Sequence, residues 1–289
     1  MPPEHDESIG QRLLRIGAYD GTVVGGLAVA LMSGTYALRD LPPDLPLMGL
    51  AFCGALLLYQ LDRVLAVSPE DRFNQPDRAA WVDRHRRYVW TTIGLAAVGA
   101  ALSMVMLRGR TLVAGAVLGT IGLVYVLPVL PGSRRLKSIG WIKPIAIAGA
   151  WAAGAVLVPV VEAGQPLGAD VWSLAGYRFL FLMPNALLAD WADRAGDARV
   201  GLRTVATQWT PRRIRWVATG ALGVALLGVV VALMRGASAL LAVDSIGPVL
   251  MLGAVWRAPK WGRLARDLVP DLIVAWPLVP FVMSLLLGG

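Results

Sequence analysis

Long apolar runs separated by short polar segments make up most of the chain. A helix needs about 20 apolar residues to cross the hydrocarbon core of a bilayer. The pattern therefore predicts an all-α, polytopic membrane protein, a bundle of nine transmembrane helices. The nine predicted spans are 18–38, 45–61, 88–107, 111–130, 141–161, 170–190, 216–234, 237–256 and 269–287.

The composition supports an integral membrane protein. Hydrophobic residues make up 56% of the chain and charged residues 16%, whereas about 25% of a soluble domain is charged. The single cysteine, Cys53, excludes an intrachain disulfide and makes a thiol-based metal site untenable. The two histidines, His5 and His85, are too far apart in the sequence for a histidine metal centre.

The basic residues predict the orientation of the chain. Most of the 27 Lys and Arg residues fall at the N-terminus and in alternate loops, which places these segments in the cytoplasm. The exceptions are Arg39, Arg108, Arg110 and Arg235 on the other side and Arg178 within a span. Because orientation explains the net charge of +8, we expect no nucleic-acid partner. We expect one membrane domain, 1–289, with a polar cytoplasmic segment at 1–15, in a cell membrane of bacterial or archaeal type.

An acidic stripe ends the predicted span 170–190. Asp190, Asp193 and Asp197 are spaced by three and four residues, so a helix places them on one face. Three like charges so placed repel each other, and Arg194 and Arg199 point away from the stripe. A divalent cation such as Mg²⁺ is the better counter-charge, because it takes carboxylate oxygens and is commonly completed by substrate phosphates. The alternative is a solvated acidic helix end that only stops the apolar run.

A second polar constellation follows the second span. Asp71, Asn74 and Arg78 are spaced by three and four residues, with Pro76 between the last two. An acid, an amide and a cation brought together suit a metal–phosphate site. The alternative is an ordinary capped loop helix with surface charges.

Together these segments resemble the UbiA superfamily of intramembrane prenyltransferases. The family's second motif, D-x-x-D-x-x-x-D-x-x-x-G-x-x-T, matches from Asp190 to Thr204 at every named position. Its first motif, N-D-x-x-D-x-x-x-D-x-x-N-x-P-x-R, matches only at Asp71, Asn74, Pro76 and Arg78. The segment from Tyr125 to Lys143, followed by Trp151, is also similar to the family's Tyr/Pro-basic segment.

The first motif departs from the family in its first half. The positions of the earlier motif acids hold Val64 and Val67, and the nearest upstream acid is Asp62. Either an insertion lets Asp62 serve as a metal ligand, or the site holds one metal fewer. We favour the insertion, because Asp62 ends its span as the family's motif does.

The resemblance implies a Mg²⁺-dependent prenyltransferase with its active site facing the cytoplasm. The enzyme would transfer an isoprenoid group from a prenyl diphosphate to an aromatic or other lipophilic acceptor through an allylic carbocation. The implied catalytic and metal residues are Asp62, Asp71, Asp190, Asp193 and Asp197. The implied diphosphate-binding residues are Asn74, Arg78, Lys137 and Lys143.

Three other functions remain open on the sequence. A membrane terpene cyclase would use the same site without an acceptor, and the divergent first motif permits it. A transporter would show internal repeats and broken midplane helices, and no convincing repeat is visible in the sequence. A non-catalytic homologue would share the fold of the family without its activity.

Overall fold

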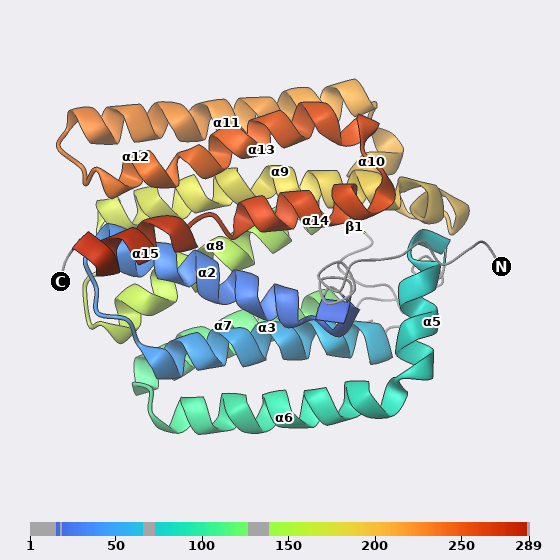
Figure 1. Ribbon diagram of the computed structural model, residues 1–289, viewed down its shortest axis with the longest axis horizontal. Helices are drawn as coiled ribbons and strands as arrows, with labels where there is room; N and C mark the ends of the chain where they lie inside the picture. Colours follow the sequence, from blue (N-terminus) through green and yellow to red (C-terminus); the bar gives the residue numbers. More distant parts are fainter. Residues whose placement is uncertain (1–15, 18, 66–72, 127–138, 288–289) are drawn as a thin grey trace.

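The computed structural model describes residues 16–17, 19–65, 73–126 and 139–287. Within them all regular secondary structure is helical apart from one pair of two-residue strands, and most long helices run side by side (Figure 1). The elements are α2 (Thr22–Arg39), α3 (Leu45–Leu65), α5 (Pro76–Arg84), α6 (Arg86–Val105), α7 (Gly109–Val126), β1 (Ile139–Gly140), α8 (Ile142–Glu162), α9 (Ala169–Arg199), β2 (Arg203–Thr204), α10 (Val205–Gln208), α11 (Pro211–Met234), α12 (Leu240–Asp244), α13 (Ile246–Arg257), η2 (Ala258–Lys260), α14 (Arg263–Val274) and α15 (Leu278–Leu287).

Within the described residues, seven helical stretches are long and apolar enough to cross a membrane. They correspond to every predicted span except the fourth and the sixth. The fourth, 111–130, falls on α7, a shorter apolar helix, and continues beyond the described residues. The sixth, 170–190, lies in α9, where Arg178, Pro184 and Asn185 interrupt the apolar run. The all-helical membrane class is confirmed, and the number nine stays a prediction.

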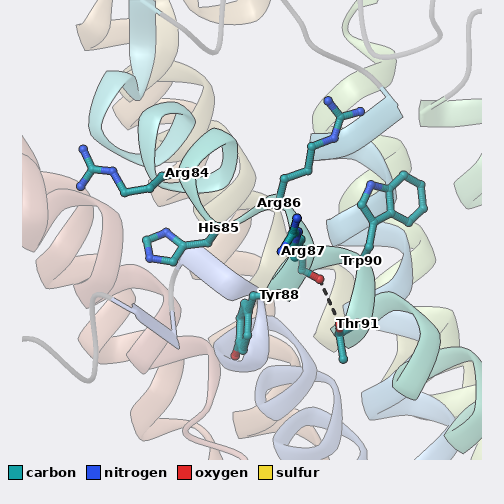
Figure 2. Close-up of a pocket in the computed structure, with 7 residues that line it drawn as sticks. All are labelled: Arg84, His85, Arg86, Arg87, Tyr88, Trp90 and Thr91. Atoms are coloured by element: carbon teal, nitrogen blue, oxygen red, sulfur yellow. Dashed lines mark hydrogen bonds between the residues drawn. The ribbon is translucent and has the colours of Figure 1, made fainter.

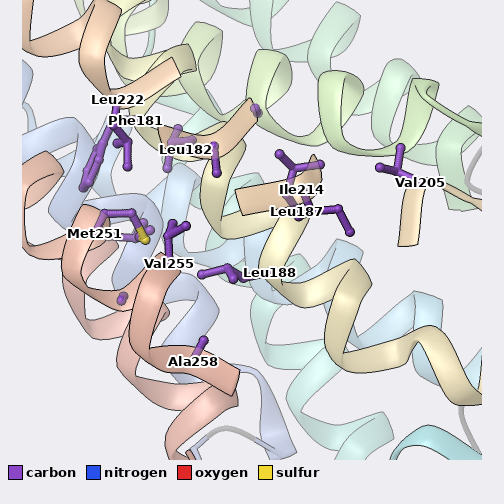
Figure 3. Close-up of a cluster of buried hydrophobic side chains, with 14 of the residues drawn as sticks. Phe181, Leu182, Leu187, Leu188, Val205, Ile214, Leu222, Met251, Val255 and Ala258 are labelled. Atoms are coloured by element: carbon purple, nitrogen blue, oxygen red, sulfur yellow. The ribbon is translucent and has the colours of Figure 1, made fainter. Parts of the chain in front are cut away.

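Helix α9 is the central helix of the bundle. It packs against α8, α10, α11, α13 and α14, and Figure 3 shows its side chains at the contact with α11 and α13. Because lipid tails are as apolar as these side chains, close packing holds the helices together rather than exclusion of water. The contact is made by Phe181, Leu182, Leu187 and Leu188 of α9, Ile214 and Leu222 of α11, and Met251 and Val255 of α13.

Small residues bring α8 close to α9. Ala148, Ala152 and Ala155 recur at spacings of four and three residues, so they share one face of α8. All three are buried in the same cluster as the α9 side chains. Small side chains let the two backbones approach closely. This packing holds Lys143, in the first turn of α8, at the level of the acidic end of α9.

Candidate active site

The acidic stripe lies on the C-terminal turns of α9. The residues Asp190 and Asp197 are 1% and 2% exposed, and Asp193 is half-buried. Arg194 and Arg199 are exposed, as their helical positions predict. The three carboxylates therefore face the protein, although the adjacent arginines face outward.

The Gly and Thr of the second motif end α9 and anchor the chain that follows it. Gly201 adopts a left-handed φ of 72°, which glycine accepts without a Cβ clash. The Leu202 N–H donates to the Asp197 carbonyl at 2.9 Å, as in a Schellman helix end. The next residues form β2, in which Thr204 pairs with Gly140 of β1. The motif thus ties the end of α9 to the segment that leads into α8.

Asn74 joins the loop of the first motif to the helix of the second. Its Oδ1 atom accepts a hydrogen bond from the Gly196 N–H at 2.8 Å, and both residues are buried. A Cβ at Gly196 would collide with the Asn74 amide, so the glycine is required for this approach. One residue earlier, the Phe73 ring lies under the Arg199 guanidinium at 5.2 Å. The two segments, distant in sequence, therefore meet at the acidic end of α9.

A lysine from α8 faces the first acid of the stripe. The distance from Lys143 Nζ to Asp190 Oδ1 is 2.5 Å, and this pair is largely buried. The other oxygen of Asp190, Oδ2, is buried without a hydrogen-bond partner among the described residues. Part of the counter-charge that the stripe requires is therefore supplied by Lys143, and not by the flanking arginines or a metal alone.

Tyr125 and Asp62 belong to the same electrostatic neighbourhood. Tyr125, in the last turn of α7, interacts electrostatically with Lys143, Asp190, Asp62 and Asp197. Asp62 lies in the last turn of α3 and is half-buried. The ends of α3, α7, α8 and α9 thus converge on one polar region.

The remaining predicted residues divide into two groups. Arg78 lies in the first turn of α5, two residues after Pro76 begins that helix. Asp71 and Lys137 lie outside the described residues. In the part of the chain that the structure describes, no group of three or more His, Cys, Asp and Glu side chains is arranged to hold a metal ion.

Sequence reasoning missed a second buried ion pair on α9. The Arg178 guanidinium donates to both carboxylate oxygens of Asp244 at 2.8 and 2.9 Å, and the Tyr177 hydroxyl donates to the same carboxylate at 2.7 Å. The pair is about 18 Å along the helix from Asp190, at 1.5 Å per residue. Ionisable residues within spans usually pair with one another. That rule predicts an anionic partner for Arg178 but does not indicate which acid it is, because several predicted spans contain one.

Comparison with known proteins identifies the family. The sequence model of the UbiA prenyltransferase family matches residues 84–267, more than half of the chain. No curated protein sequence matches. The matched range contains the second motif and begins after Arg78, so the divergent first motif lies outside it.

Solved structures share the fold at low identity. An apo UbiA homologue from Aeropyrum pernix K1 superimposes with a TM-score of 0.66 at 12% identity, covering 93% of this chain and 98% of that one. A UbiA homologue from Archaeoglobus fulgidus bound to DMAPP and Mg²⁺ gives 0.63 at 12% identity, covering 95% and 99%. A digeranylgeranylglyceryl phosphate synthase structure gives 0.56 at 15% identity, covering 94% and 95%. With its family motif, its helical membrane fold and these structural neighbours, the chain belongs to the UbiA prenyltransferase family.

Proposed function

We propose that this chain is a Mg²⁺-dependent membrane prenyltransferase that transfers an isoprenoid group from a prenyl diphosphate to a lipophilic acceptor. The hydrogen bond from Gly196 N–H to Asn74 Oδ1 supports the proposal most directly. It joins the loop of the first motif to the end of α9, the helix that also carries the Lys143–Asp190 pair, so acids and cations from distant parts of the chain meet at one end of this helix. Such a mixture suits a metal–diphosphate headgroup, which carries charges of both signs.

A divalent cation would complete the coordination of the acidic stripe. The Asp190 Oδ2 atom is buried without a partner among the described residues, and an unsatisfied buried carboxylate oxygen is costly. Asp190, Asp193 and Asp197 would hold one Mg²⁺, and Asp62, Asp71 and Asn74 would help to hold a second. When bound, Mg²⁺ supplies Lewis-acid stabilisation of charge on the leaving diphosphate. The Archaeoglobus fulgidus homologue, which shares the fold, was solved with DMAPP and Mg²⁺.

The basic residues would bind the diphosphate. Lys143 already lies against Asp190, so a bound diphosphate would give its ammonium group a second anionic partner. Arg78 and Lys137 would add fixed positive charge. As the allylic C–O bond breaks, its electron pair leaves with the diphosphate, and these cations stabilise the charge that develops. The acceptor then donates an electron pair to the allylic cation and releases a proton.

The location of the site follows the distribution of basic residues. Nine spans with the N-terminus inside would place the acidic end of α9 on the cytoplasmic side of a bacterial or archaeal cell membrane. The whole chain would then form one membrane domain, with the isoprenoid tail among the helices and the diphosphate at the interface.

The proposal is tested by diphosphate release from geranylgeranyl or farnesyl diphosphate in proteoliposomes. We expect turnover with Mg²⁺ and none after chelation. Asp193→Ala should abolish turnover, since it removes the middle carboxylate of the stripe. Asp170→Ala is the matched control, because this acid lies in the first turn of the same helix and is 60% exposed. Normal turnover in chelator or in the Asp193 variant would overturn the proposed metal site.

The products of the same assay identify the reaction. A labelled product that contains an acceptor indicates a transferase. A bare hydrocarbon or alcohol indicates a terpene cyclase, which the divergent first motif permits. If neither product forms with any prenyl diphosphate, the chain is a non-catalytic homologue or a transporter.

A further inference from the structure

A basic corner lies where α5 meets α6. Arg84 ends α5, His85 links the helices, and Arg86 and Arg87 begin α6. Together with Tyr88 and Trp90 they line an open pocket, and Figure 2 shows the guanidinium groups spread around it. We call Arg84, Arg86, Arg87 and Trp90 the α5–α6 corner. Neither sequence motif includes these residues.

The three arginines of the corner are exposed, and none has an ion-pair partner within the described ranges. Two basic residues at the start of α11, in contrast, each contact an aromatic ring. Arg213 stacks on Trp209 at 4.2 Å, and Arg215 lies over Trp256 at 5.2 Å.

Among the described residues, two acids close to the corner in sequence or through Tyr88 form no ion pair with its arginines. Asp83 precedes Arg84 and is exposed. Asp20 is buried and accepts hydrogen bonds from Tyr88 and Thr22. Within the described part of the chain, the corner therefore keeps a surplus of positive charge.

The corner lies at the level of a membrane surface. Helix α6 is a candidate membrane span that begins at Arg86, so its first turn is at one boundary of the bilayer. Trp90, one turn further along, is 44% exposed. Tryptophan is enriched at this depth, where its ring meets both headgroups and acyl chains. Helix α5 runs across the direction of the spanning helices (Figure 1), as a segment lying along the surface would.

We propose that the α5–α6 corner binds the headgroup of an anionic phospholipid in the leaflet on the side of the acidic motifs. The lipid phosphate accepts hydrogen bonds from the guanidinium groups, which suit phosphate geometry. The Trp90 ring packs beside the glycerol and upper acyl chain. The lipid must carry a net negative charge. In a zwitterionic lipid the ammonium group of the headgroup already neutralises the phosphate, so the arginines gain less from binding it.

The test measures which lipids stay bound. The full chain is reconstituted in nanodiscs with equal phosphatidylglycerol and phosphatidylcholine, and bound lipids are counted by native mass spectrometry. We expect enrichment of phosphatidylglycerol on the unmodified protein. An arginine near an anionic surface contributes about fivefold in affinity, so R84Q/R86Q/R87Q should lower this enrichment at least tenfold.

The control removes the same charge elsewhere on the same side. R212Q/R257Q/K260Q neutralises three exposed cations at the starts or ends of other helices and should retain the enrichment. Unchanged melting temperatures show that both triple variants fold. Equal phosphatidylglycerol retention in the two triple variants would overturn the proposal, as would equal retention of the two lipids by the unmodified protein.

Two further experiments distinguish a bound lipid from a bound soluble anion. Trp90→Leu should weaken retention of phosphatidylglycerol a few-fold, because it removes only the ring contact. Inorganic phosphate at millimolar concentration should not displace the lipid. Displacement by inorganic phosphate, together with no effect of Trp90→Leu, would identify a soluble-anion site and contradict a lipid site.

Discussion

Helix α9 carries two buried ion pairs that differ in how fully their carboxylates are satisfied. Both oxygens of Asp244 accept hydrogen bonds, from Arg178 and from Tyr177. At the other end of the helix, Asp190 meets Lys143 through one oxygen, and its second oxygen has no hydrogen-bond partner among the described residues. We call these the closed pair and the open pair.

The difference separates a structural contact from a candidate binding site. The closed pair ties α9 to α12, with no carboxylate oxygen left for a ligand. The open pair keeps one acceptor available beside two further acids of the stripe, at the point where Asn74 brings in the first motif. Charge inside a membrane protein is costly in either place. The closed pair offsets that cost by hydrogen bonds to both carboxylate oxygens, and we infer that the open pair is completed by a cation.

The largest expected effect is at the open pair. Asp190→Asn should lower diphosphate release about a thousandfold, because loss of several kcal/mol of metal stabilisation corresponds to that factor. Turnover is measured per folded molecule, with the melting temperature as the check on folding. Turnover within tenfold of the unmodified chain would contradict a ligand role for Asp190.

The next effect is on stability at the closed pair. Asp244→Asn should lower the free energy of unfolding by about 3–5 kcal/mol, because it leaves the Arg178 charge buried without an anion. Turnover per folded molecule should stay within twofold. The measurement is reversible unfolding in mixed micelles, with D170N as an exposed control on the same helix. A large loss of turnover at full stability would mean that the closed pair takes part in the reaction.

A smaller effect is expected at the junction between the motifs. Asn74→Ala removes the acceptor for the Gly196 N–H, which costs about 1–3 kcal/mol when the donor is left buried. Turnover should fall about tenfold as the first-motif loop loses its anchor. Asp77→Ala, an exposed residue of α5, is the control. If both variants turn over equally, the contact does not position the loop.

The smallest stability effects should come from replacing both members of a pair. Y177F/R178M/D244L should be within about 1 kcal/mol of the unmodified chain, since apolar replacement of every member of a buried polar cluster is often neutral. K143M/D190L should be similarly stable but inactive. Diphosphate release by K143M/D190L would show that the open pair is not part of the active site, which is the claim that separates it from the closed pair.

The family and the membrane class could be predicted from the sequence. The match over residues 84–267 and the apolar helices confirm both. Burial of Asp190 and Asp197, with Arg194 and Arg199 exposed, follows from a spacing of three and four residues along one helix. The span count was harder to predict, because α9 combines a central position with polar residues that interrupt its apolar run.

Pairings between helices could not be predicted. No local pattern indicates that Lys143 meets Asp190, that Asn74 reaches Gly196, or that Arg178 is neutralised by Asp244. Each contact joins segments that are dozens of residues apart in the chain, and each depends on the depth and rotation of two packed helices.

The residue pattern alone was thus enough for the helical membrane class, the family and the acidic stripe, because periodicity and motif spacing are properties of a continuous segment. Only the folded bundle decided which cation faces which acid and which of the two pairs retains an unsatisfied oxygen. Packing sets these outcomes, because a shift of one residue in helix register would exchange one buried partner for another.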